Sequence, residues 1–245
     1  SKNKESLVNM YNLFIAMDPA LTTFTQSSPF YQGKRLGKDA RVIMYRGGKE
    51  LDSPDGLYAN MPMFGGLQQY KTTGMDLLNV INERREDWKA LVKKAQIGAK
   101  TLTLFGSTLD TTWNPVKVSP HGTMEQRGMD MNHPRIIIAV ALIIKYVSRL
   151  VQEEFVQIVP SDKAVREPFV REKDVVYIPP HTHVREKLQK AAAYKGLKDE
   201  GVIKHCVGLL KLAKSAMPKS RHPLMEPLEK MIKEKKTTAD TIITE

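Results

Sequence analysis

The sequence is poor in the features that mark several common protein classes. It contains one cysteine, Cys206, so no internal disulfide can form and we expect a reducing, cytoplasmic compartment. Its longest apolar run, Ile136–Ile144, is far shorter than the roughly 20 residues that a membrane-spanning helix needs, so no membrane partner is expected. The chain opens on polar residues rather than on a signal peptide. Its Gly-Gly pairs lack the Gly-Lys-Ser/Thr of a P-loop.

What the chain has in excess is positive charge. Its 245 residues carry 38 Lys and Arg against 27 Asp and Glu, a formal net charge of +11, which favours a polyanionic partner. Aromatic residues make up only 7%, and none lies in an RNA-binding or zinc-finger pattern. The low aromatic content argues against a basic nucleic-acid-binding module, but the positive charge keeps such a module as an alternative. The 41% of hydrophobic residues is enough for the core of one large domain or two small ones.

Hydrophobic spacing predicts helices along much of the chain. Leu7 to Ile15 has the spacing of one helix face, and Asp18-Pro19 is expected to interrupt it before a second short helix. Thr73 is expected to cap a long helix. A helix from Pro134 is apolar on every side and is expected to be central and buried, and the tail after Lys236 is expected to fray. Further helices are predicted at 185–194, 202–217 and 224–235, and strands at 101–105, 110–118, 122–129, 155–159 and 174–178.

The segment from Gln26 to Gly66 is crowded with glycine and has little periodicity. It predicts a long irregular loop, and loops of that length inside a compact domain are usually functional. Its first part contains Ser-Ser-Pro-Phe-Tyr-Gln-Gly-Lys, followed by several cations. Hydroxyls, an amide and cations in one loop offer many donors to an anionic ligand, but a basic surface loop would look the same.

The second chemical feature is the segment from Gly122 to Asp130. In a strand, Thr123, Glu125 and Arg127 would share one face. A carboxylate and a guanidinium on that face suit a polar cavity that holds a divalent cation and a phosphate. The alternative is a solvated sheet face with an internal ion pair.

Together these two features resemble the bacterial glutamate–cysteine ligase and carboxylate–amine ligase family, which has a Ser-Ser-Pro-Phe/Tyr-x-x-Gly loop and a downstream Gly-Thr-x-Glu-x-Arg-x-x-Asp strand. The resemblance spans about Leu13 to Glu154. It implies an α+β, glutamine-synthetase-like fold with a curved antiparallel sheet. It also implies ATP-dependent phosphorylation of the glutamate side-chain carboxyl, then attack by an amine such as cysteine, as in glutathione biosynthesis.

The resemblance also implies roles for individual residues. Glu125 would be a catalytic residue and a ligand of Mg²⁺ or Mn²⁺, and Arg127 would be catalytic and contact the transferring phosphate. The remaining expected contacts are Ser27, Ser28, Tyr31, Gln32 and Arg41 with the acidic substrate, and Lys34, Arg46 and Thr123 with ATP. A phosphoryl transfer of this kind needs positive charge rather than a protein nucleophile.

The chain also departs from the family. The glutamate-rich opening strand and a later His-bearing strand are missing, so the chain is expected to be a carboxyl-terminal portion whose amino-terminal half lies elsewhere, inactive alone. The usual Trp-Asp-x-Arg is replaced by Trp113-Asn114-Pro115-Val116-Lys117, which leaves the amine acceptor open. A catalytically incomplete structural or regulatory homologue is therefore a second alternative. We expect a partial catalytic domain at 1–160, with its active-site loop at 26–66, and a mainly helical region packed on it at 161–245; a homo-oligomer is possible.

Overall fold

Helices dominate the protein, and its few strands form small sheets, so the fold is α+β. The computed structural model describes residues 4–98, 100, 114–119, 121 and 123–244. The longer helices are α1 (Lys4–Thr25), α4 (Gly74–Lys94), α6 (Pro134–Glu153) and α9 (Glu200–Ala216). The shorter helices are α2 (Ala40–Arg46), α3 (Pro62–Gly65), α7 (His181–His183), α8 (Gln189–Tyr194), α10 (Glu226–Glu234) and α11 (Thr238–Thr244).

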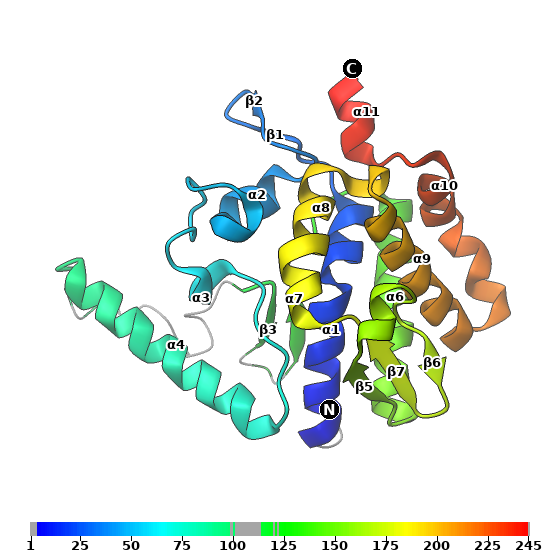
Figure 1. The fold of residues 1–245 in the computed structure, drawn as a ribbon, viewed down its shortest axis with the longest axis horizontal. Coiled ribbons are helices and arrows are strands. Elements are labelled where there is room, and N and C mark those ends of the chain that lie inside the picture. The colour runs from blue at the N-terminus through cyan, green and yellow to red at the C-terminus, as the bar shows by residue number, and fades with distance from the viewer. Residues whose placement is uncertain (1–3, 99, 101–113, 120, 122, 245) are drawn as a thin grey trace.

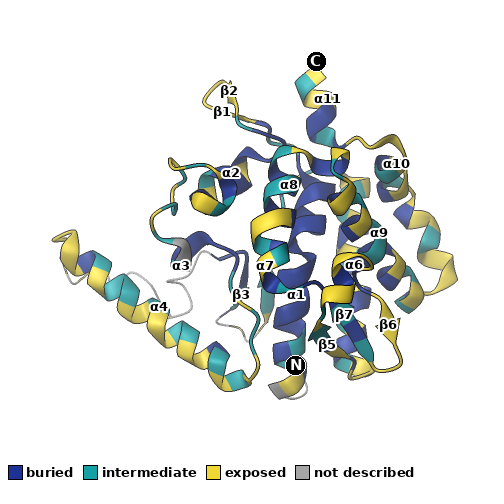
Figure 2. Cartoon of the chain, viewed as in Figure 1, coloured by how far each residue is buried: buried dark blue, intermediate teal, exposed yellow. Residues whose placement is uncertain are grey.

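Helix α1 is the centre of the molecule. Residues 10 to 26 are all buried, and α1 packs against α6, α8 and α9 (Figures 1 and 2). One apolar cluster unites these helices and includes residues from both sides of position 160. Helix α4 instead extends away from the other helices (Figure 1), and its exposed residues outnumber its buried ones.

The strands form three separate sheets in the described part of the chain. Two are antiparallel hairpins, β1 (Phe30–Tyr31) with β2 (Lys34–Arg35) and β3 (Val116–Val118) with β4 (Met124–Gln126). In the third, β7 (Val175–Ile178) pairs in parallel with β5 (Gln157–Pro160) and antiparallel with β6 (Arg171–Glu172). The predicted strands near 155–159 and 174–178 are thus confirmed, and the one predicted at 101–105 lies outside the described residues.

The predicted break at Pro19 is wrong, because α1 runs through it without interruption. Proline removes one helical hydrogen bond and usually breaks or kinks a helix. Here the hydroxyl of Thr23 donates to the carbonyl of Pro19 at 2.7 Å, and His205 of α9 bonds the Ala16 carbonyl at 2.8 Å. Burial on all sides also holds the helix in place, so tertiary packing overrides the local signal.

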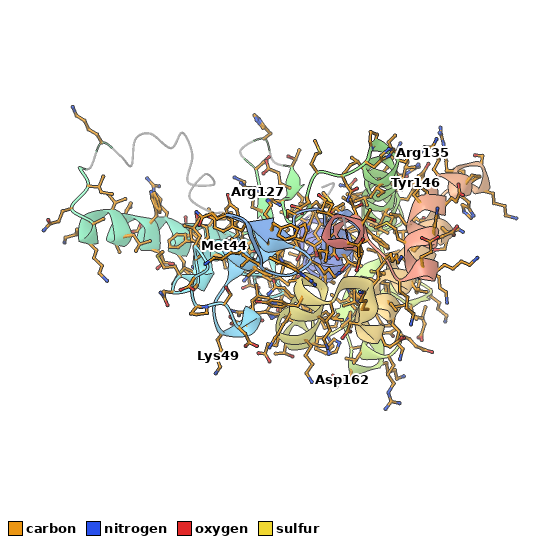
Figure 3. The ribbon with its side chains drawn as sticks, turned by 90° about the horizontal axis from the view of Figure 1, so that it is seen from above. Met44, Lys49, Arg127, Arg135, Tyr146 and Asp162 are labelled. Carbon is orange, nitrogen blue, oxygen red and sulfur yellow. The ribbon has the colours of Figure 1, made fainter. Side chains whose placement is uncertain are left out.

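Two further helix predictions need correction. Helix α6 begins at Pro134 as expected, but it is not buried on every side: Ile138 is 51% exposed. Figure 3 shows Arg135 and Tyr146 of α6 far from α4, on the other side of the molecule, and of these two Arg135 is exposed and Tyr146 is buried. The tail does not fray after Lys236. It forms α11, whose Asp240 is buried against Lys38 in an ion pair.

The segment from 26 to 66 is not wholly irregular. It contains the β1–β2 hairpin, helix α2, which buries one face and exposes Arg41 and Tyr45, a 3-10 helix at Lys49–Leu51 and α3. Periodicity missed α2 because the helix has only seven residues. The predicted capping box at Thr73 is confirmed, since Thr73 and Asp76 bond each other's backbone amides. Cys206 is buried, and none of the described helices could cross a membrane.

Candidate anion-binding site

The two sequence features meet in space although about 100 residues separate them. The carboxylate of Asp130, at the end of the second feature, accepts from the Ser27 amide at 3.1 Å and from the Ser28 hydroxyl at 2.5 Å. The Ser27 hydroxyl donates to the Met131 carbonyl at 2.6 Å. The two serines are therefore occupied in joining the loop to the strand, rather than pointing into a cavity.

Helix α2 makes the second connection. Arg41 donates to the carbonyls of Met129 at 2.8 Å and Arg127 at 3.0 Å. Asp39 caps the helix by accepting from the Val42 amide at 2.8 Å. This cap fixes the start of the helix, and the helix in turn sets where Arg41 and Arg46 lie.

A pocket of about 80 Å³ lies where these elements meet. Three arginines, Arg41, Arg46 and Arg127, line it, and no Asp or Glu of the described residues does. Pro115 of the loop before β3 and Gly65 of α3 complete the wall. Figure 3 labels Arg127 together with Met44 of α2 in this part of the molecule. We call this pocket the three-arginine pocket.

Arg46 is held in place by a buried network. Both of its terminal nitrogens donate to the carboxylate of Asp18, and one also donates to the Gln189 side chain at 2.9 Å. Gln126 of β4 donates to the same carboxylate at 2.9 Å. Asp18 is fully buried and Arg46 is 6% exposed, so each compensates the other's charge. The network fixes the base of the pocket.

Strand β4 ends at Gln126, earlier than the predicted strand at 122–129, and Gly128 allows the segment that follows it to approach this ion pair. A Cβ atom at Gly128 would lie 2.4 Å from an Asp18 oxygen and 2.5 Å from an Arg46 nitrogen. Both neighbours are buried and bonded, so neither can move aside at low cost. The glycine after Arg127 is therefore required by close approach of the backbone.

Asn114, where the sequence departs from the family pattern, has a structural role. Its side-chain amide is fully buried and donates to the Gly66 carbonyl at 2.8 Å. An ionised carboxylate at this position could not donate that bond. Asn114 therefore joins the segment before β3 to Gly66, which directly follows the pocket residue Gly65.

Other predicted site residues lie elsewhere. Tyr31, Gln32 and Lys34 are exposed in the β1–β2 hairpin, which projects from the body (Figure 1), and none lines the three-arginine pocket. Gln32 and Gly33 have positive φ angles of 49° and 76° and form its two-residue turn. The Thr123 hydroxyl is 2.7 Å from that of Ser119 and so bonds within its own hairpin.

Glu125 is partly buried and lies directly opposite Lys117 in the β3–β4 register. Its neighbour Gln126 faces α1, so alternation places Glu125 on the other face of the hairpin. Among the described residues, no three Asp, Glu, His or Cys side chains gather where they could hold a metal ion. The role of Glu125 as a ligand of Mg²⁺ or Mn²⁺ stays a prediction, since Mg²⁺ is commonly held by one or two carboxylates together with the phosphates of a substrate.

The site contains one carboxyl with a strongly perturbed pKa. Burial raises the pKa of Asp39 to about 7, and the nearby carboxylate of Asp130 contributes. One oxygen of Asp39 caps α2, while the other has no hydrogen-bond partner among the described residues. Sequence reasoning missed Asp39, Asp18 and Gln189 as site residues. An aspartate within the apolar stripe of α1 was the available signal for Asp18, and nothing in the sequence pointed to Gln189.

Comparison with known proteins adds no assignment. No family model matches the chain, and no curated protein matches it. The functional argument therefore depends on the residues and their geometry.

Proposed function

We propose that the three-arginine pocket binds the acidic substrate, or the phosphoryl group transferred to it, in an ATP-dependent carboxylate–amine ligase reaction. One observation carries this proposal. The loop from Ser27 and the segment ending at Asp130, which the resemblance expects to share a site, are bonded together, and three arginines line the pocket beside them. A concave set of guanidinium groups is well suited to carboxylate and phosphate oxygens.

The size of the pocket limits what it can hold. About 80 Å³ is well above the roughly 10–15 Å³ that one water needs, but below the roughly 300 Å³ of small ligand pockets. It therefore suits one carboxylate or phosphoryl group rather than a whole nucleotide. The rest of the substrate, and ATP, would bind outside it.

The chemistry asked of these residues is electrostatic. Glutamate's side-chain carboxylate is a poor electrophile until it is phosphorylated, and both its own charge and that of the transferring phosphoryl group oppose the reaction. Arg41 and Arg127 would attract and orient these anions, and Arg46, compensated by Asp18, would donate hydrogen bonds from a fixed position. The glutamine-synthetase-like fold is part of this proposal, with the β3–β4 hairpin as a piece of the curved sheet.

The test is phosphate release from ATP with glutamate and a panel of amines that includes cysteine, measured for the purified chain alone, where we expect no turnover, and for the chain together with the amino-terminal half that the resemblance implies. Glutamate-dependent release that Arg41→Gln reduces at least tenfold supports the proposal. The matched control is Arg135→Gln, on the exposed end of α6, which should leave the rate unchanged. Release that does not depend on glutamate, or that both substitutions reduce equally, contradicts it.

Two other outcomes identify the alternatives. Glutamate binding that depends on Arg41 without any ATP turnover indicates the incomplete structural or regulatory homologue. Salt-dependent binding of generic duplex DNA that Arg41→Gln leaves unchanged, with no glutamate binding, indicates the nucleic-acid-binding module.

A further inference from the structure

A second pocket lies between α4 and the linker that joins α3 to α4. Its volume is about 310 Å³, within the range of small-molecule sites. It shares no lining residue with the three-arginine pocket. Three of its lining side chains are cationic, Lys71 from the linker, Arg84 from α4 and Arg185 from the π-helical turn Val184–Leu188.

We propose that this pocket binds a phosphate monoester, with the phosphoryl group held by Lys71, Arg84 and Arg185 and an apolar body seated against the remaining wall. We call it the linker pocket. It is a separate site from the one proposed for the ligase substrate.

The three cations are held by the fold before any ligand arrives. The side chain of Asn12, on the buried helix α1, accepts from the Lys71 amide at 2.7 Å and donates to the Lys71 carbonyl at 2.8 Å. Arg185 donates to Glu50 at 2.6 Å, and Arg84 donates to Asp87 at 2.8 Å. A preorganised set of donors loses little freedom on binding, which favours affinity.

Donor capacity remains after these contacts. Glu50 and Asp87 each engage one terminal nitrogen of their arginine, and the Nε of Arg84 is buried without a hydrogen-bond partner among the described residues. The charges of Asp76 and Glu83 act on Lys71, so they compensate part of its charge. A buried donor without a partner is costly, and a phosphate oxygen would accept a hydrogen bond from the Nε of Arg84.

The local electrostatics point the same way. Burial lowers the pKa of Lys71, although Asp76 opposes the shift, and the charge of Arg84 lowers it further. Lys71 and Arg84 are thus close enough to repel each other, and an anion between them would relieve that repulsion. Glu83 lines the same pocket, so the cations outnumber the carboxylates there without the site being purely basic.

The remainder of the lining argues for an ester rather than a free inorganic ion. Met63, Leu67 and Val80 contribute apolar side chains to the same wall. An organic group on the phosphate could contact them and gain the free energy of apolar burial. A phosphate monoester combines both requirements, a dianionic head and an apolar body.

The experiment uses phenyl phosphate, inorganic phosphate and phenol as probes, titrated calorimetrically into the whole chain. Phenyl phosphate should bind more tightly than inorganic phosphate, and phenol should not bind measurably. Arg84→Gln should weaken phenyl phosphate at least tenfold, because a hydrogen bond to a charged group contributes about 1.5–3 kcal/mol. Arg85→Gln is the matched control: it removes the same charge from the next, exposed position of α4 and should change the affinity less than twofold.

Two further variants keep the test decisive. Lys71→Met retains the apolar stem of the side chain and should also weaken phenyl phosphate binding at least tenfold. It carries the test if circular dichroism shows that Arg84→Gln does not fold. Arg41→Gln should leave the Arg84-dependent binding event unchanged, because Arg41 belongs to the three-arginine pocket, where only a second, separate binding event would be lost. Equal weakening by Arg84→Gln and Arg85→Gln, or weakening by Arg41→Gln alone, would overturn the proposal. The first result does not concern the proposed ligase site, whereas the second would support phosphoryl binding there.

Discussion

Asp39 gives the sharpest prediction about the stability of the site. Its pKa is raised from an ordinary 3.8 to about 7 by burial, so the folded protein binds this proton more tightly than the unfolded chain does. The contribution of this proton to the free energy of unfolding is fully present below pH 3.8 and is lost as the pH rises toward about 7. At 1.36 kcal/mol per pKa unit, ionising Asp39 above pH 7 costs about 4 kcal/mol.

Asp39→Asn isolates this cost, because asparagine caps a helix as well as aspartate does and carries no charge. The free energy of unfolding, measured by urea titration at a series of pH values, should differ little between the two proteins near pH 4. The variant should gain about 1.4 kcal/mol per pH unit above that and level off near pH 7. An identical difference at every pH, or a variant less stable than the wild type at pH 8, would refute the reasoning.

Three other perturbations test the packing around the site. Asp18→Ala leaves the buried guanidinium of Arg46 uncompensated and should cost about 3–5 kcal/mol of unfolding free energy in urea titrations; a cost below 1 kcal/mol would contradict the buried pair. Gly128→Ala should cost about 1–3 kcal/mol, because its Cβ would overlap that pair, and an unchanged melting temperature would disprove the close approach. Lys38→Met removes the buried cation that pairs with Asp240, which keeps only the exposed Lys198 at 3.4 Å, and should speed hydrogen exchange in α11 above all, whereas an exchange rate equal to that of wild type would show that the buried pair does not hold the helix.

The sequence was most informative where local chemistry decides the structure. The Thr73 capping box, the helix start at Pro134 and the strands near residues 157 and 175 follow from short-range rules and are confirmed. Pro19 shows the limit of those rules, because burial and a bond from a helix almost 190 residues away keep α1 continuous. The tail was judged by its position near the chain end, but it is anchored by a partner 202 residues upstream.

The predictions for the candidate site show the same difference between local and long-range information. The family resemblance implied that the Ser27 loop and the Gly122–Asp130 segment belong together, and the bonds of Asp130 and Arg41 join them. The roles expected of single residues were harder to predict, since the serines turn out to be structural links and Tyr31, Gln32 and Lys34 are exposed. Which side chain lines a pocket depends on the twist of the hairpin and on the rotation of the helix about its axis. Both are set by tertiary packing, which local sequence patterns do not reveal.

The most direct test of the central claim is a calorimetric titration of glutamate into the wild-type protein and into Arg127→Gln, with Arg135→Gln as the control. The account predicts saturable binding to the wild type and the control, and affinity at least tenfold weaker for Arg127→Gln, because the arginine lines a pocket sized for one acidic group. Equal affinity for all three proteins, or no binding to any of them, would contradict it.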